Sequence, residues 1–357
     1  MHFSKTGRSI ALVVVLCAAA CSDPSNRDLR IAQSRTIATL TIDDPAFDEI
    51  RDAEWLDDSV VAVVAGNGTR IAIVRSGRTP KFLGRAGSGP GEFKSVSSLS
   101  PFTAETFLAV DPATRRLSSW THDGDLLADI KLDAAPVAGP WRTVHGAELK
   151  ISSRDEVIAP LLVVSGAATR QRVHRDSSRR ITTACPLCNR SIAPDGSVAI
   201  GDGATEYRLR RVDAQGRALA AIVRNDVPPV AVTPFERDSA AAFRAAHCEE
   251  LRASGISDLA IRQLLSSFPA AKQKGVFVAG GFRHDDKGNL WLQRNVMRGA
   301  PGEVDVYAPD GVLQGTVMLP PGFIVKRIRG PFVLGLQVAD DERMRIVTLR
   351  ISAFRYF

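Results

Sequence analysis

Residues 106–126, TFLAVDPATRRLSSWTHDGDL, contain the unit that decides the fold of this chain. An apolar strand over residues 106–111 is followed by a short gap, a second strand over residues 116–120 and a turn at Asp123-Gly124. Short apolar strands bounded by Asp and Gly are typical of antiparallel sheets. The stretch therefore predicts paired strands of one small sheet.

The same unit recurs along the chain. Further clear copies cover residues 195–216 and 286–313, and weaker copies cover residues 58–83, 155–181 and 331–351. The units start roughly 40 to 50 residues apart, with one longer interval, which is the period of four-stranded propeller blades. We therefore predict an all-β fold, a six-bladed β-propeller over residues 35–357.

The longer interval contains residues 234–274, whose composition differs from the rest. Apolar residues recur there at helical spacing among Ala, Arg and Glu, and Gly255 and Pro269 interrupt the pattern. This pattern predicts two short helices inserted between the fourth and fifth blades. The alternative is a blade whose pattern is not recognisable.

A ring of blades must also be closed. Residues 35–42, RTIATLTI, alternate as a strand does. We predict that this strand joins the last blade, because both chain ends would then share one sheet and few strand edges would stay exposed.

The N-terminus has the pattern of an export signal. A short basic stretch ending at Arg8 precedes the apolar run from Ile10 to Ala20. This run has about half of the ~20 residues that a membrane-spanning helix needs. We therefore predict that residues 1–20 are a signal peptide.

Cys21 follows three small residues, Ala18-Ala19-Ala20, and precedes a polar segment. This arrangement resembles a bacterial lipobox, which implies that Cys21 becomes the lipidated first residue of the mature protein. Residues 21–34 would then be a flexible tether to the membrane. The alternative is ordinary cleavage after Ala20, with Cys21 left unmodified.

Composition and charge exclude some classes of partner. The chain is 45% hydrophobic and 24% charged, as ordinary globular proteins are. Its formal charge of +7 comes mostly from singly spaced arginines, without the aromatic interleaving of a nucleic-acid surface. We expect no nucleic-acid partner, and we expect a monomer.

Residues 83–93, LGRAGSGPGEF, carry a family resemblance. Together with Val110-Asp111 and Asp123-Gly124, they resemble the NHL-repeat type of β-propeller, and the chain is similar to the six-bladed propeller lipoproteins of bacterial envelopes. We expect a structural loop in which Gly87, Gly89, Pro90 and Gly91 form the turn. Phe93 would be an apolar anchor between neighbouring blades.

Cysteines offer the one motif that could carry chemistry, Cys185-Pro186-Leu187-Cys188. In an exported protein, Cys185 and Cys188 are candidates for a local disulfide, and free thiols, a redox pair or half of a zinc site are the alternatives. Cys248 would then be a buried apolar residue, unless it pairs with one of the other two cysteines.

Catalytic and metal-binding patterns are weak. Acidic residues that could surround a cation on the propeller axis sit where turns and strand ends also favour Asp; they are Asp111, Asp202, Asp285 and Asp305. The histidines are scattered, without a zinc-protease motif, and no serine lies in a nucleophile elbow. We therefore assign no catalytic residue, metal ligand or cofactor, and leave open a divalent cation in the axial funnel.

These observations favour a non-catalytic binding or scaffold module of the bacterial cell envelope, anchored through Cys21. Its partner would be an envelope protein, a peptide or a carbohydrate, contacted by a propeller face and by the helical insertion. The alternatives are a metal-dependent hydrolase or lyase of the lactonase kind, and the ligand-binding component of an uptake system.

Overall fold

The computed structural model describes most residues between Ile31 and Ile351. These are residues 31–41, 47, 49–75, 78–131, 189–201, 205–213, 217–253, 255–266, 272–338 and 344–351, with short strands between 143 and 182. The predicted signal peptide and Cys21 lie outside them, as do Cys185 and Cys188.

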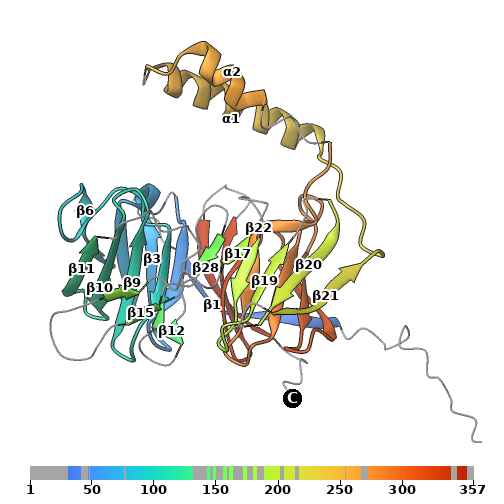
Figure 1. Ribbon diagram of the computed structural model, residues 1–357, viewed down its shortest axis with the longest axis horizontal. Coiled ribbons are helices and arrows are strands. Elements are labelled where there is room, and N and C mark those ends of the chain that lie inside the picture. The colour runs from blue at the N-terminus through green and yellow to red at the C-terminus, as the bar shows by residue number, and fades with distance from the viewer. Residues whose placement is uncertain are drawn as a thin grey trace, which may run out of the picture.

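Antiparallel sheets of up-and-down strands make up this part of the chain (Figure 1). We name each blade after its first strand. The β2 blade consists of β2 (Asp52–Trp55), β3 (Val60–Ala65), β4 (Arg70–Arg75) and β5 (Lys81–Leu83). The β8 blade consists of β8 (Ser98–Pro101), β9 (Thr106–Asp111), β10 (Arg116–Thr121) and β11 (Leu126–Lys131).

Three more blades follow the segment 132–188. The β18 blade consists of β18 (Arg190–Ile192), β19 (Val198–Gly201), β20 (Tyr207–Val212) and β21 (Ala218–Arg224). The β22 blade consists of β22 (Phe277–His284), β23 (Leu290–Arg294), β24 (Gly302–Tyr307) and β25 (Leu313–Leu319). The β26 blade contains β26 (Phe323–Arg329), β27 (Phe332–Val338) and β28 (Met344–Ile351).

Short strands lie in the segment between the β8 and β18 blades. They are β12 (Thr143–Val144), β13 (Glu148–Leu149), β14 (Glu156–Ile158), β15 (Leu161–Val163), β16 (Arg172–His174) and β17 (Arg180–Thr182). They pair as β12 with β13, β14 with β17 and β15 with β16. Two smaller strands, β6 (Arg85–Ala86) and β7 (Glu92–Phe93), form the loop between the β2 and β8 blades.

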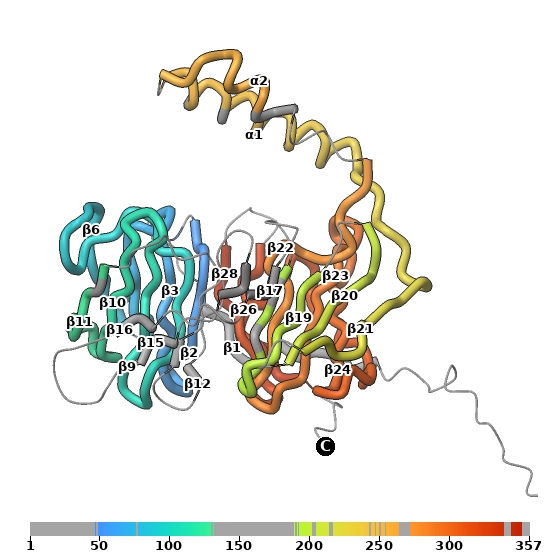
Figure 2. Tube along the Cα trace, in the orientation of Figure 1, coloured from blue at the N-terminus to red at the C-terminus, as the bar shows by residue number. Residues whose placement is uncertain are grey.

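The first strands of the blades contact one another in the order β8, β2, β26, β22, β18. They therefore line a common axis, from which the remaining strands of each blade extend outward (Figure 2). This arrangement is a β-propeller.

The hydrophobic core lies between neighbouring blades. Alternate side chains of β3 point to opposite faces of its sheet: Val61 and Val63 pack with Leu334 of the β26 blade, whereas Ala62 packs in the cluster that contains Phe107 of the β8 blade. Because both faces are covered, β3 reads VVAVVA without a polar residue. Each buried valine contributes about 1.5–3 kcal/mol relative to exposure.

The N-terminal strand β1 (Ile31–Thr41) closes the ring. It pairs antiparallel with β28 over residues 34–41, and its first three residues pair in parallel with β25. The prediction that an N-terminal strand joins the last blade is confirmed. The strand begins earlier than predicted, so residues 31–34, assigned from the sequence to the tether, belong to the sheet.

Two helices, α1 (Pro234–Ala253) and α2 (Asp258–Ser266), lie between β21 and β22, as predicted, although α1, with 20 residues, is longer than the short helix expected. Thr233 and Glu236 form a capping box, in which each side chain accepts a hydrogen bond from the other residue's backbone N–H. Pro234 occupies the first helical position, where a missing N–H removes no hydrogen bond of the helix. Gly255, at φ +80°, follows α1 and ends it.

The helices form an arm that projects from the ring (Figures 1 and 2). Its base is a short antiparallel stem. There the Lys274 N–H donates a hydrogen bond to the carbonyl of Val230, and the Val232 N–H donates one to the carbonyl of Lys272. An ion pair of 2.5 Å between Lys274 and Glu236 joins the stem to α1. Among the described residues, no helix has the length and apolar character needed to cross a membrane.

Candidate axial site

Two carboxylates lie on the inner strand of the β2 blade. Along β2, Ala53 and Trp55 point into the core shared with the β26 blade, so Asp52 and Glu54 share the other side of the strand. Both are only 5% exposed. Buried carboxylates need a cation or several hydrogen bonds to remain ionised.

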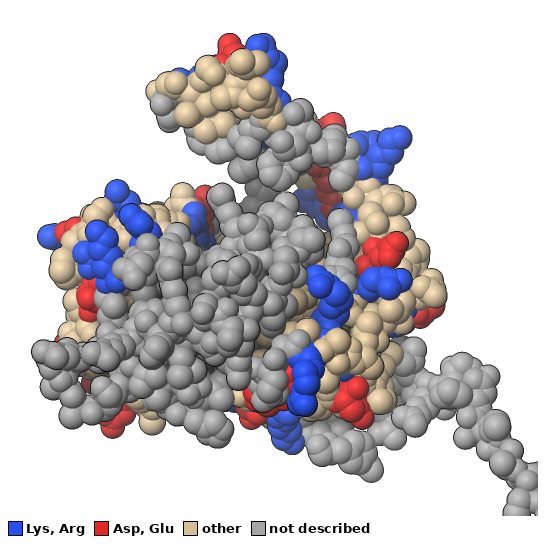
Figure 3. All heavy atoms as spheres, in the orientation of Figure 1, with Lys and Arg blue, Asp and Glu red and all other residues tan. Residues whose placement is uncertain are grey.

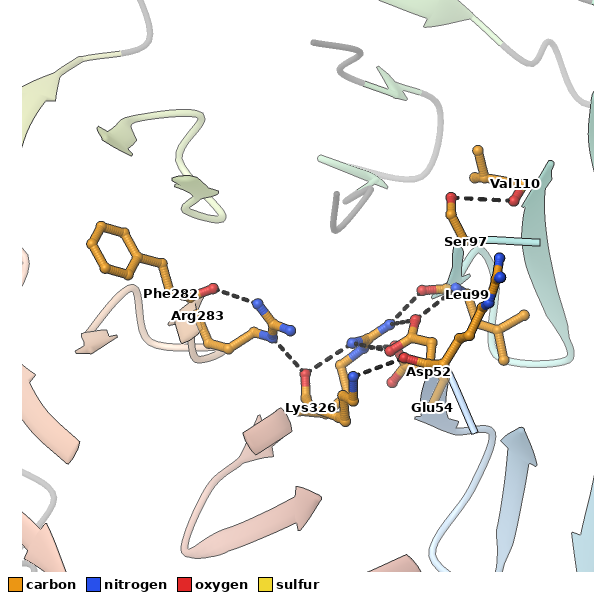
Figure 4. Close-up of polar contacts among 10 residues, drawn as sticks. Asp52, Glu54, Ser97, Leu99, Val110, Phe282, Arg283 and Lys326 are labelled. Carbon is orange, nitrogen blue, oxygen red and sulfur yellow. Dashed lines mark hydrogen bonds and ion pairs between the residues drawn. The ribbon is translucent and has the colours of Figure 1, made fainter. Parts of the chain in front are cut away.

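Arg327 of β26 supplies that cation to Asp52 and Glu54, the two carboxylates labelled in Figure 4. Its two terminal nitrogens donate to the two oxygens of Asp52, at 3.1 and 2.7 Å, and its Nε donates to Glu54. The same terminal nitrogens also donate to the carbonyls of Lys326 and Leu99, at 2.8 and 2.6 Å. One guanidinium thus joins the β26, β2 and β8 blades.

The electrostatics of this cluster favour the ionised forms. Burial by itself would raise the pKa of Asp52, but the charges of Arg327 and Lys326 and the N–H of Leu99 lower it below the usual value. Burial would likewise lower the pKa of Arg327, and Asp52 and Glu54 raise it instead. Asp52 and Arg327 therefore stay charged at neutral pH.

Two further cations, Lys326 and Arg283, lie beside this cluster and are half-buried. The Lys326 ammonium donates to the carbonyl of Arg51 at 2.7 Å. Arg283 of β22 donates through Nε to the carbonyl of Lys326 at 2.8 Å and through a terminal nitrogen to the carbonyl of Phe282 at 2.6 Å. The carbonyl of Lys326 thus accepts from both Arg283 and Arg327.

Most of the acidic residues considered for a cation site have structural partners instead. Asp111 accepts the N–H groups of Lys94, Ser95, Ala113 and Thr114. The Asp285 carboxylate accepts hydrogen bonds from the backbone N–H groups of Lys287 and Asn289 and from the Trp291 indole. The Asp305 carboxylate accepts hydrogen bonds from the hydroxyls of Tyr207 and Thr316 and from the Arg224 guanidinium. Asp202 lies outside the described residues.

Within the described part of the chain, no three His, Cys, Asp or Glu residues gather closely enough to hold a metal ion.

The glycine-rich loop lies between the β2 and β8 blades. The Glu92 carboxylate accepts from the N–H groups of Ser88 and Gly89, at 3.0 and 2.8 Å, and closes the turn that contains Pro90. Phe93 is 2% exposed, and the centroid of its ring lies 5.9 Å from the centroid of the Trp120 ring.

Other loop glycines have separate roles. Gly87 N–H donates to the carbonyl of Phe93, and Gly91 N–H donates to Asp129 of the β8 blade at 2.9 Å. Gly84 has φ +70°, and a side chain there would meet the Phe93 ring.

Cys248 is a free, buried thiol on α1. It is 8% exposed, and Ile261 of the nearby helix α2 is 2% exposed. The proposed pairing of Cys185 with Cys188 falls outside the described residues.

A cavity of about 140 Å³ lies between the β18 and β22 blades. Its lining mixes both signs of charge, with Asp195 and Asp286 against Arg211 and Lys287. His284 also lines it, and its Nδ1 lies 2.9 Å from the Ser191 hydroxyl. A cavity of this size holds a molecule about as large as benzene, but its balanced charge indicates no ligand class.

Charges on the outer surface are mixed. In Figure 3, Lys and Arg side chains lie among Asp and Glu side chains over the described part of the visible face. This pattern contrasts with the axial cluster, where Arg327 pairs with two buried carboxylates.

Sequence reasoning missed the residues of this cluster. A signal for them exists, because Asp52-Ala53-Glu54-Trp55 and Lys326-Arg327 place charged side chains inside strands whose neighbouring residues are buried. Such charges are costly unless they pair. The sequence pattern alone does not show which inner strands are neighbours in the fold.

Comparison with known proteins gives little beyond the fold. No protein-family model matches the sequence, and no curated protein matches it either. Matching solved structures include a member of the DUF4221 family from Bacteroides vulgatus, with 8% identity and a TM-score of 0.49 over 90% of this chain and 98% of that one.

Two further matching structures are of proteins whose names state a function. The calcium-binding protein regucalcin from Agrobacterium tumefaciens is 12% identical, with a TM-score of 0.45 over 90% of this chain and 96% of that one. Virginiamycin B lyase from Staphylococcus aureus is 8% identical, with a TM-score of 0.45 over 90% and 99%. Identities this low say nothing about the activity of this chain, whose propeller architecture follows from its own sheets.

Proposed function

We propose that this chain is a non-catalytic binding propeller of the bacterial cell envelope. In this proposal, residues 1–20 are a signal peptide, Cys21 carries the lipid, and six blades form the ring, with residues 143–182 in the sixth. The observation that carries the non-catalytic assignment is the pairing of Asp52 and Glu54 with Arg327. Carboxylates held by a guanidinium are not free to bind a divalent cation.

The helical arm supports a role in binding. Phe235, Ile256 and Leu259 are 54%, 44% and 60% exposed, and α1 and α2 stand away from the sheets (Figure 1). Exposed apolar side chains on a projecting element are a frequent feature of protein contact surfaces. We propose that the arm contacts the partner, while the axis holds a ligand group.

Metal content tests the non-catalytic assignment. The full-length protein, purified without chelator or metal-affinity resin, should retain less than about one equivalent of calcium or zinc, and calcium should not raise its melting temperature. Asp52→Asn is the informative variant, and Asp58→Asn is its control, because Asp58 pairs with Arg329 at the exposed rim. One retained equivalent that Asp52→Asn removes and Asp58→Asn keeps would favour a metal-dependent hydrolase or lyase.

Photo-crosslinking in cells tests the arm. A photoreactive residue at Leu259 should give a crosslinked species, whereas the same residue at Val312, in a turn of the β22 blade and 40% exposed, should not. Equal products from both positions, or none from Leu259, would contradict the role of the arm.

Membrane fractionation tests the anchor. Cys21→Ser should move the protein from the membrane to the soluble fraction, because the acyl chains hold it at the bilayer. Unchanged fractionation would favour ordinary cleavage after Ala20.

A further inference from the structure

The helical arm leaves the ring through two chain segments, residues 225–233 and 272–276 (Figure 2). Both segments are anchored in the core between the β18 and β22 blades. Val227 of the first segment packs against this core, and Val276 of the second belongs to it and is 2% exposed. Beyond these anchors the two segments pair as the antiparallel stem. The arm therefore starts from a fixed base.

Lys274 joins this base to the first turn of α1. Its ammonium lies 2.5 Å from the Glu236 carboxylate and donates a hydrogen bond of 3.0 Å to the carbonyl of Val296, in the connection between β23 and β24. The two side chains of the ion pair are only 17% and 24% exposed, so salt screens the pair less than one on the open surface. Burial by itself would raise the pKa of Glu236, but Lys274 and Thr233 hold it below its usual value. The ion pair therefore persists at neutral pH.

Arg298 holds the same turn of α1 through the neighbouring residue. Its guanidinium carbon lies 3.9 Å from the centroid of the Phe235 ring, in a cation–π contact. Arg298 also belongs to the connection between β23 and β24, which Asn295 fixes by donating from its side-chain amide to the carbonyls of Gly275 and Phe277, at 2.7 and 2.8 Å. Consecutive side chains of a helix point about 100° apart. Contacts to Phe235 and to the residue that follows it therefore restrain both the tilt and the rotation of α1.

We infer that Lys274 and Arg298 are positioning residues, which set the direction of the arm so that it meets its partner as a rigid, pre-oriented element. This inference rests on the proposed function, in which the arm contacts the partner, and it specifies how that contact is prepared. Neither residue needs to touch the partner. A docking element that is already oriented loses less conformational entropy on binding, so an arm released at its root binds more weakly although its contact residues are unchanged.

Distances between two spin labels test the rigidity of the arm in the full-length protein. Spin-labelled non-natural residues replace Leu259 on α2 and Val312 in a turn of the β22 blade, both of which are exposed, and the native cysteines stay unlabelled. Double electron–electron resonance of the otherwise unchanged protein should give one narrow distance distribution. Lys274→Gln and Arg298→Gln should each broaden or shift it, and the charge-conserving Lys274→Arg should keep it narrow.

The matched control is Arg217→Gln, which removes an ion pair from the turn before β21, away from the root of the arm. It should leave the distance distribution unchanged. Because the positioning contacts lie outside the sheets, the melting temperature of all these variants should stay within about 3 °C of the wild-type value. This measurement separates a released arm from an unfolded ring.

Crosslinking in cells connects the direction of the arm to binding. With the photoreactive residue at Leu259, Lys274→Gln should lower the yield of the crosslinked species at least about five-fold, and Lys274→Arg should keep it within about two-fold. A broad distance distribution in the wild-type protein, or the same narrow distribution in both Gln variants, would overturn the inference. An unchanged crosslinking yield from an arm whose distance distribution has changed would also overturn it.

Failure of this inference and failure of the proposed function give different results. A wild-type crosslink from Leu259, together with Gln variants that keep the wild-type distance distribution, would remove the positioning role and leave the binding arm. A narrow distribution that both Gln variants disrupt, without any crosslink from Leu259, would contradict the proposed function on which the inference rests.

Discussion

Arg327 donates to both carboxylate oxygens of Asp52, at 3.1 and 2.7 Å, although the two residues are 275 positions apart in the sequence. Arg327 lies on the inner strand of the β26 blade, and Asp52 lies on the inner strand of the β2 blade, so the pair joins the last blade to the first. The Leu99 N–H, from the β8 blade, donates to the same carboxylate. Ionic contacts at the axis therefore connect blades whose outer strands are far apart.

Removing the arginine should destabilise the ring. Arg327→Gln leaves Asp52 and Glu54 buried without their cation, and such a loss costs about 3–5 kcal/mol in free energy of unfolding. Urea unfolding of the full-length protein measures it. Arg329→Gln should change the same quantity much less, because its partner Asp58 is fully exposed and its other contacts, the Asp57 carbonyl and the face of the Trp55 ring, leave no buried charge unpaired. Similar effects of the two substitutions would contradict the axial pairing.

Stability should rise with pH in the alkaline range because of Lys326. Its pKa is about 8 in the folded state and about 10.4 in an unfolded chain. Between these values the unfolded chain binds the extra proton, so the free energy of unfolding increases with pH, and below pH 8 the buried charge lowers stability. The groups around it, Asp52, Arg283 and Arg327, keep their charges throughout this range.

The measurement compares the wild type with Lys326→Met between pH 7.5 and about pH 10.5. The wild type should gain about 1 kcal/mol or more relative to the variant over this range. Parallel curves for the two proteins would show that Lys326 has an ordinary pKa.

The loop between the β2 and β8 blades should not tolerate a side chain at Gly84. A Cβ there would lie 2.3 Å from the Phe93 ring and 2.9 Å from the carbonyl of Gly91. Gly299 has a similar φ of +80°, but a Cβ there meets nothing within 4 Å. Both Ala variants carry the strain of a positive φ, about 1 kcal/mol.

The difference between the variants therefore isolates the clash. We expect Gly84→Ala to lower the melting temperature by several degrees more than Gly299→Ala does, because a displaced Phe93 leaves its core. Equal melting temperatures would indicate that the loop adapts without loss of packing.

Deleting the closing strand should cause a cooperative loss of stability. Without residues 31–41, β28 and β25 both lose a partner and expose strand edges. We expect the melting temperature to fall by more than about 10 °C, measured by circular dichroism. Removing residues 23–28 instead, ahead of the strand, should leave melting unchanged, and an equal fall would show that β1 itself is not the cause.

The outer parts of the blades could be predicted from the sequence because local pattern determines them. The second and third strands of these blades have apolar runs bounded by turns that contain Asp or Gly, and five of the six repeats begin at the second strand of a described blade. The repeat over residues 155–181 lies in the segment where the structure describes only paired short strands. The arm could be predicted because its apolar residues follow helical spacing and Gly255 ends α1. Period and turn chemistry are properties of neighbouring residues, and a single sequence displays them directly.

The inner strands were not recognised, and the axial site was missed with them. Their sequences, such as Asp52-Ala53-Glu54-Trp55, mix charged and apolar residues because one face lines the axis and the other packs on a neighbouring blade. Whether Asp52 is a metal ligand or an ion-pair partner depends on Arg327. The contact between Asp52 and Arg327 is long-range, and the spacing of residues in a single sequence does not reveal it.

The position of β1 makes closure of the ring depend on the C-terminal strands. The partners of β1 are residues 316–318 of β25 and residues 345–351 of β28, so β1 stays unpaired until the chain has been synthesised through these strands. A prematurely terminated chain keeps open strand edges, which proteases and other unfolded chains recognise. A chain that stops before β28 therefore leaves β1 without its antiparallel partner, and its own unpaired strands mark it for removal.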